Sequence, residues 1–139
     1  MKPETQKILE LTEARVRTLG ALAEELRASF GALTQLDIAA IQEHTKRQQE
    51  LVEQIRGLDR EAAKLGAEVH GVDQEAAPIL RAVAAGLLRV QAEVRRLNHT
   101  QDQLLKGWRR SINLLLSLAG FYPEPGVRAV RAPAFEARR

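Results

Sequence analysis

Apolar residues recur at steps of three and four along most of the chain, the spacing that places side chains on one side of an α-helix. In the first such segment, two interleaved rows with a period of seven residues form the seam of a coiled coil or helical bundle. The rows consist of Leu9, Val16, Ala23 and Phe30, and of Thr12, Leu19, Leu26 and Leu33. The pattern predicts a helix over residues 5–30, with Gly31 as its C-cap.

A second segment repeats this pattern over residues 35–70. Thr34 followed by Asp37 resembles a capping box, the arrangement of polar side chains that opens a helix. The end of this second helix is open, because Gly66 and Gly71 are both credible stops.

A third helix is predicted over residues 78–119, because Pro78 suits the first helical position and Gly120 suits the position after the last. Its seam consists of Leu80, Val83, Leu87, Val90, Val94, Leu97, Gln101, Leu104, Trp108, Leu115 and Leu118. Only a short turn separates it from the second helix, so the two should be antiparallel neighbours. That packing brings Gln48 level with Gln101. These amides either bond to each other and fix the register, or lie at the solvent edge.

The end of the third helix carries more apolar surface than a small bundle needs. Beside the seam, apolar side chains occupy other faces of its last turns, namely Ile112, Leu114, Leu116 and Ala119. Antiparallel packing places residue 112 level with Asp37. Residues 112–119 should therefore extend ~10 Å, at the helical rise, past the turn between the first two helices at residues 34–37. Exposed apolar patches usually mark interaction sites. Either a partner covers this end, or the end self-associates, or the tail folds back through Phe121, Val127, Val130 and Phe135.

Composition and charge narrow the fold and the functional class. Aromatic residues make up only 4% of the 139 residues, which is typical of a helical protein and unusual for a catalytic domain. We therefore expect one all-α domain, an antiparallel bundle or coiled coil of three long helices over residues 1–119, with a flexible basic tail over residues 120–139. Residues 1–105 carry 14 Lys and Arg against 16 Asp and Glu, whereas residues 106–139 carry 7 against 2. The basic excess thus belongs to the end of the chain, and without an ordered basic face bearing aromatics we expect no nucleic-acid partner.

No motif of reactive residues points to an enzyme. Cysteine is absent, and His44, His70 and His99 are scattered without metal-ligand spacing, so we expect no catalytic residue, cofactor or metal site. The N-terminus lacks the basic and apolar regions of a signal peptide, and no apolar run approaches the ~20 residues of a membrane span. A cytoplasmic protein that does not insert into a membrane is therefore expected.

Several features of the C-terminal half occur in a characteristic order. Leu97-Asn98 precedes the pair Leu104-Leu105, a leucine-rich last turn follows, and Tyr122 and Gly126 come after it. This order resembles that of the FlgN-type flagellar export chaperones, small helical proteins that escort hook–filament junction subunits to the flagellar type III export gate. Earlier in the chain, Asp37, Lys46 and Leu51-Val52 stand in an order similar to that in the family's second helix. The spacing from Lys46 to the Leu-Val pair is longer than in the family pattern. Gln101 stands where the family has a second Asn.

The resemblance implies that the C-terminal half binds a terminal segment of a hook-associated junction protein as cargo, and that Tyr122 docks on the cytoplasmic domain of the export gate. The cargo would form an amphipathic helix that lays its apolar face against the end of the third helix. The predicted cargo-binding residues are Leu104, Leu105, Trp108, Ile112, Leu115, Leu116 and Leu118. The alternatives are a structural coiled-coil protein that self-associates through this end, for example as a homodimer, and a regulatory protein that binds nucleic acid through its basic tail.

Overall fold

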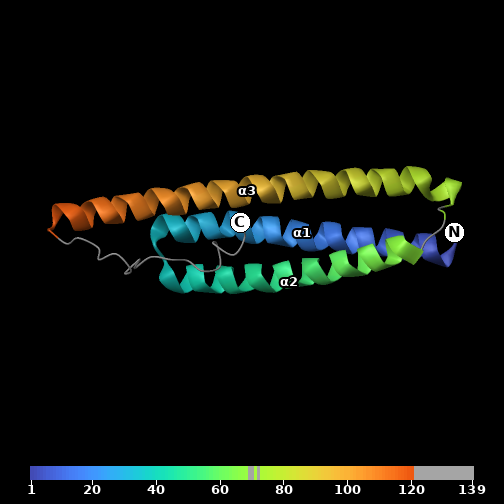
Figure 1. The fold of residues 1–139 in the computed structure, drawn as a ribbon, viewed down its shortest axis with the longest axis horizontal. Helices are drawn as coiled ribbons and strands as arrows, with labels where there is room; N and C mark the ends of the chain where they lie inside the picture. The colour runs from blue at the N-terminus through green and yellow to red at the C-terminus, as the bar shows by residue number, and fades with distance from the viewer. Residues whose placement is uncertain (69–70, 72, 121–139) are drawn as a thin grey trace. The chain divides into compact units, whose positions relative to one another are not determined.

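The computed structural model describes residues 1–68, 71 and 73–120, and their regular secondary structure is entirely helical. Three long helices follow one another, α1 (Pro3–Gln35), α2 (Ile38–Glu68) and α3 (Ala77–Leu118), and a short 3₁₀ turn (Gln74–Ala76) leads into α3 (Figure 1). The expected all-α fold of three long helices is confirmed. The predicted tail begins at the last described residue, Gly120, so residues 121–139 lie outside the described residues.

The chain divides into two compact units, Met1–Leu97 and Asn98–Arg139. The first unit holds α1, α2 and the first half of α3, and the second unit holds the rest of α3. The assignment of residues 1–119 to a single bundle stays a prediction, as does the level of residues 112–119 relative to the turn between the first two helices.

The turn between α1 and α2 corrects the prediction that Gly31 ends the first helix. Helix α1 continues to Gln35, and Leu36 takes the left-handed conformation of a C-cap, with φ 55° and ψ 35°. Because Ala32 and Leu33 are both buried, the apolar face extends past Gly31 and packing carries the helix on. The left-handed conformation costs a non-glycine residue ~1–2 kcal/mol. Hydrogen bonds from the Leu36 and Asp37 amides to the Leu33 and Ala32 carbonyls offset this cost, at 3.3 and 3.0 Å.

The N-cap of α2 is also corrected, because it is Asp37, three residues after the expected Thr34. Thr34 belongs to the last turn of α1, where its hydroxyl donates to the carbonyl of Phe30 at 2.6 Å. Asp37 is the N-cap of α2 instead, since its carboxylate accepts the amide of Ala40 at 3.2 Å. The other end of α2 is Glu68, which lies between the two glycines that were credible stops.

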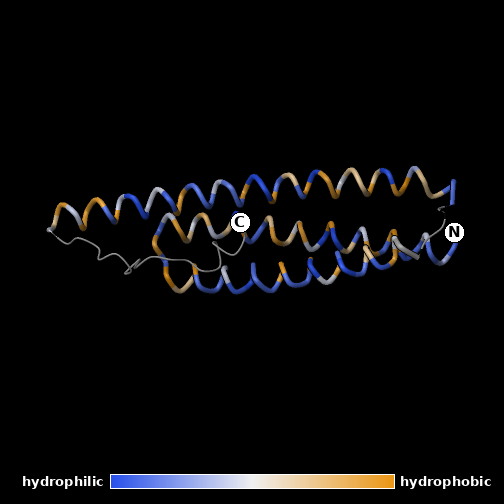
Figure 2. Tube along the Cα trace, viewed as in Figure 1, coloured by the Kyte–Doolittle hydropathy of each residue, from blue (hydrophilic) through white to orange (hydrophobic). Residues whose placement is uncertain are grey.

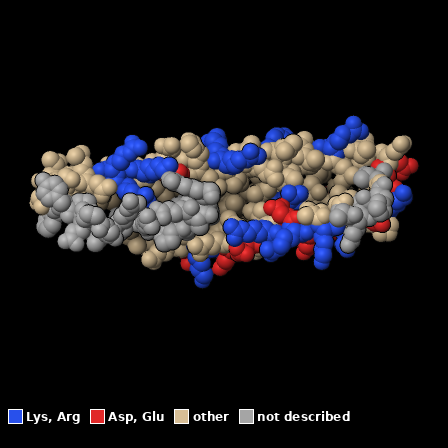
Figure 3. All heavy atoms as spheres, in the orientation of Figure 1, with Lys and Arg blue, Asp and Glu red and all other residues tan. Residues whose placement is uncertain are grey.

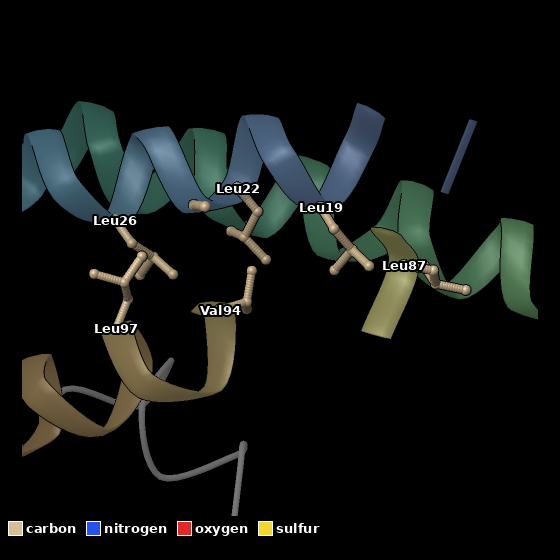
Figure 4. Close-up of a cluster of buried hydrophobic side chains, with 7 residues drawn as sticks. Leu19, Leu22, Leu26, Leu87, Val94 and Leu97 are labelled. Atoms are coloured by element: carbon tan, nitrogen blue, oxygen red, sulfur yellow. The ribbon is translucent and has the colours of Figure 1, made fainter. Parts of the chain in front are cut away.

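The core of the first unit joins α1 to the first half of α3. Figure 4 shows Leu22 and Leu26 pointing toward Val94 and Leu97, and Leu26 is fully buried. The buried cluster consists of Leu19, Leu22, Ala23, Leu26, Leu87, Val94 and Leu97, and Leu51, Val52 and Ile55 of α2 pack against it. Each buried leucine contributes ~1.5–3 kcal/mol. The predicted seam is confirmed for six buried positions of this cluster, namely Leu19, Ala23, Leu26, Leu87, Val94 and Leu97, whereas buried Leu22 lies outside it. Apolar positions recur along each helix in Figure 2.

Ion pairs on the surface of the first unit also link its helices. Arg15 of α1 pairs with Asp59 of α2 at 2.9 Å, and Arg27 of α1 pairs with Glu93 of α3. Exposed pairs of this kind contribute only ~0–1 kcal/mol each. They therefore add little to the stability of the unit.

Two buried amides interrupt the apolar seams. Gln48 of α2 and Gln101 of α3 are each 2% exposed, so the alternative that they lie at the solvent edge is wrong. Within the described ranges, Gln48 Nε2 and Gln101 Oε1 have no hydrogen-bond partner. Their mutual hydrogen bond stays a prediction.

Candidate functional site

The last three turns of α3 expose their side chains. Every residue from 110 to 120 is exposed, although the helix continues to Leu118. The large apolar side chains among them are Ile112, Leu114, Leu115, Leu116 and Leu118, and we call this set the apolar end of α3. An exposed apolar cluster of this density on one short stretch is the usual mark of an interaction site.

The seven residues predicted to bind cargo all lie on α3, within the second unit. Four of them, Ile112, Leu115, Leu116 and Leu118, are exposed and belong to the apolar end. The other three are half-buried, namely Leu104, Leu105 and Trp108. The set therefore changes from half-buried to exposed along the helix.

Helical geometry sorts these side chains into faces. With 3.6 residues per turn, Leu105, Trp108, Ile112 and Leu116 follow one another at steps of three and four on a continuous side of α3. We call this side the apolar face. Leu114 projects from the opposite side, because two residues correspond to more than half a turn. Leu114 is 61% exposed, against 37% for Leu116, so the two leucines differ in both direction and exposure.

The C-terminus of α3 is capped by backbone hydrogen bonds, so the apolar face lies on a regular helix. The Ala119 amide donates to the Leu115 carbonyl at 3.0 Å, and the Gly120 amide to the Ser117 carbonyl at 3.2 Å. Gly120 adopts a φ of 83°, a left-handed conformation that glycine takes without a steric penalty. The prediction that the helix stops before Gly120 is confirmed. A preformed helix also lowers the entropy that is lost when a partner binds.

Charge on α3 is mostly positive. The helix carries seven Lys and Arg against two Asp and Glu, and on the face shown in Figure 3 basic side chains gather along α3 while α2 carries both signs. In the second unit, Lys106 pairs with Asp102 at 3.1 Å. Arg109 has a buried Nε with no hydrogen-bond partner among the described residues. Arg109 is not among the residues predicted from the sequence, although its spacing of three residues from Ile112 and seven from Leu116 places it beside the apolar face.

A shallow groove of about 270 Å³ lies between α1 and α2 in the first unit. It is lined by Ala21, Glu24, Glu25, Arg47, Glu50, Leu51 and Gln54. The Glu25 carboxylate already accepts hydrogen bonds from His44 at 2.7 Å and Arg47 at 3.0 Å. Burial alone would raise the pKa of Glu25, but the hydrogen bonds from His44 and Arg47 outweigh it and hold the pKa below its usual range. The half-buried Glu25 carboxylate thus joins α1 to α2.

Two other kinds of site find no support in the residues that the structure describes. Among them, no three His, Cys, Asp or Glu side chains are placed to hold a metal ion. No helix in the described ranges combines the length and apolarity needed to cross a membrane. Tyr122, predicted to dock on the export gate, lies outside the described residues, as do the tail residues considered for folding back.

Comparison with known proteins gives one result that covers nearly the whole chain. A family model described as FlgN protein matches residues 1–126. The matched range contains all three helices, the apolar end of α3 and Tyr122. No curated protein and no solved structure matches the chain.

Proposed function

Because the chain belongs to the FlgN family, the flagellar export chaperones, we propose that its cargo is a terminal segment of a hook-associated protein of the hook–filament junction. The chaperone holds this segment in the cytoplasm and delivers it to the flagellar type III export gate. The family is one of chaperones and not of enzymes, and the proposed mechanism needs neither a cofactor nor a chemical step.

The observation that carries this proposal is the exposure of the apolar end of α3. An amphipathic cargo helix can cover Ile112, Leu115 and Leu116 on one side of α3, in the helix-in-groove mode of peptide recognition. Removing that surface from water favours binding, while ordering a disordered segment costs ~2–5 kcal/mol. The balance gives a moderate affinity, which suits a chaperone that must release its cargo.

Delivery to the gate is assigned to Tyr122, which lies within the range matched by the family model. Tyrosine combines an apolar ring with a polar tip and loses little side-chain entropy when it docks. Pro123 follows it directly and Pro125 comes two residues later, and proline restricts its own backbone and that of the residue before it. Such an aromatic residue next to proline suits insertion into a pocket of the gate's cytoplasmic domain.

The experiment that tests cargo binding compares two leucines of α3. Leu116→Ser should weaken binding of purified hook-associated protein segments by about tenfold or more, because it places a hydroxyl on the apolar face. Leu114→Ser is the matched control, since it makes the same change two residues away on the opposite side. If exposure alone governed binding, the control would have the larger effect, because Leu114 is the more exposed residue.

Isothermal titration gives the affinities, and thermal melting checks that both variants fold. A larger loss for Leu114→Ser than for Leu116→Ser would contradict the assigned face. Equal affinities of both variants and the wild type would contradict cargo binding at the apolar end.

The second candidate function is a structural coiled coil that self-associates, and the same exposed leucines favour it. Its distinguishing property is assembly without cargo. Sedimentation of the purified protein at two concentrations should show a species of constant size if the protein is a chaperone. Growth of the species with concentration would support the structural alternative.

A further inference from the structure

Arg109 lies beside the apolar face of α3. It stands four residues after Leu105 and three before Ile112, the spacings at which helical side chains are neighbours. The residue is half-buried, and its Nε is buried without a hydrogen-bond partner among the described residues. A buried donor left unpaired costs ~1–3 kcal/mol. No ion pair or hydrogen bond is formed by the Arg109 guanidinium within the described ranges, so its outer nitrogens are available to a carboxylate that a partner supplies.

The helix itself offers Arg109 no free carboxylate. Asp102, seven residues earlier, already pairs with Lys106, and the chain contains no Asp or Glu from Gln103 to Gly120. Two copies that paired through this stretch would therefore bring guanidinium groups together without a carboxylate between them. The charge pattern disfavours a second copy of the chain as the occupant and favours a different, acidic partner.

We infer that Arg109 selects the cargo, and that the bound segment is an acidic amphipathic helix. A carboxylate at the edge of the segment's apolar face accepts hydrogen bonds from the Arg109 guanidinium, while its apolar side chains cover Ile112 and Leu116. The guanidinium suits this role because its planar fork can donate two parallel bonds to one carboxylate. This inference rests on the proposed cargo binding by the apolar end and adds the chemistry of the cargo.

The neighbouring charges explain why a protein segment is favoured over a lipid surface. Helices that lie on anionic membranes carry many basic residues on the polar face. Here residues 103–120 carry only three basic residues, and one of them, Lys106, already pairs with Asp102. Arg110 points away from the apolar face, because it lies two residues before Ile112. One cation at the edge of a leucine face fits one carboxylate better than it fits a charged surface.

The test uses the full-length chain and two synthetic amphipathic peptides as probes. Both peptides carry the same leucine face, and the positions at its edge are Glu in one peptide and Lys in the other. Binding is followed by the fluorescence of Trp108, which is the single tryptophan of the chain and lies next to Arg109. The wild type should bind the Glu peptide about tenfold more tightly than the Lys peptide.

Three variants test whether Arg109 causes the preference for the Glu peptide. Arg109→Gln should remove the preference, and Arg109→Glu should reverse it in favour of the Lys peptide. Arg110→Glu is the matched control, since it makes the same change of net charge one residue away and should leave the order of the peptides unchanged. Melting curves of the variants separate a change of preference from a loss of folding.

The outcomes that overturn the inference differ from those that overturn cargo binding. If the wild type binds both peptides equally, or Arg110→Glu shifts the preference as much as Arg109→Glu, Arg109 does not select cargo although the apolar face still binds it. If neither peptide binds, the assignment of the apolar face falls as well. Binding to phosphatidylglycerol vesicles that is lost in Arg109→Gln would assign the arginine to lipid and overturn the inference.

Discussion

The two halves of α3 carry the same apolar pattern in different surroundings. In the first half, Leu87, Val94 and Leu97 are buried in the core of the first unit. In the second half, Leu115 and Leu118 occupy the same seam and are 65% and 77% exposed. A heptad pattern therefore predicts a helix with one apolar side, but it does not state whether the same chain covers that side. In this protein the covered half stabilises the fold and the exposed half is proposed to bind cargo.

The largest expected effect comes from truncating one leucine in each half. Leu97→Ala should lower the free energy of unfolding by ~2–5 kcal/mol, because it leaves a cavity beside Leu26. Leu118→Ala should change it by less than ~0.5 kcal/mol, because its side chain is exposed. Urea denaturation of both variants measures the difference. Equal losses would mean that the two halves do not differ in their contribution to stability.

A smaller effect is expected beyond the end of α3, at Tyr122. Tyr122→Ala should weaken association with the cytoplasmic domain of the export gate by about tenfold, because a docking aromatic is lost. Cargo affinity should stay near the wild-type value, since the apolar face is unchanged. Binding assays with each partner separate the two roles. A variant that loses cargo and keeps the gate would place Tyr122 in the cargo site.

The smallest effect concerns the first unit alone. The pKa of Glu25 is lower in the folded chain than its ordinary value of 4.5, so this carboxylate stabilises the fold fully above that value. The contribution is lost as the pH falls below 4.5 and through the pKa of the folded state. Glu25→Gln should therefore flatten the dependence of the melting temperature on pH in this acidic range. An unchanged slope would mean that the bonds from His44 and Arg47 contribute no net stability.

The heptad spacing of apolar residues predicted the helices well, because residues at that spacing are the ones that pack in the core of the first unit. The buried positions Leu19, Leu26, Val94 and Leu97 all belong to the predicted seams. Local signals failed at the first turn, where Gly31 lies inside α1 and Leu36 forms the left-handed cap. Burial of Leu33 carries the helix past the glycine, and such tertiary packing is not visible in a local motif.

The candidate site was only partly predictable for a related reason. Leucines at helical spacing are enough to identify the apolar end of α3 from the sequence. Arg109 is not identifiable in the same way, because a single arginine on a basic helix has no distinctive sequence signal. Its importance depends on a guanidinium that has no partner among the described residues and on Asp102 being paired with Lys106, and both are properties of the folded chain.

Hydrogen exchange along α3, with and without a hook-associated protein segment, tests the central difference between the two halves most directly. Amide exchange reports local opening, so a bound partner slows it where the partner covers the helix. We predict that cargo slows exchange in residues 104–118 and leaves residues 80–97 unchanged. Slower exchange confined to α1, α2 or the first half of α3 would contradict the account.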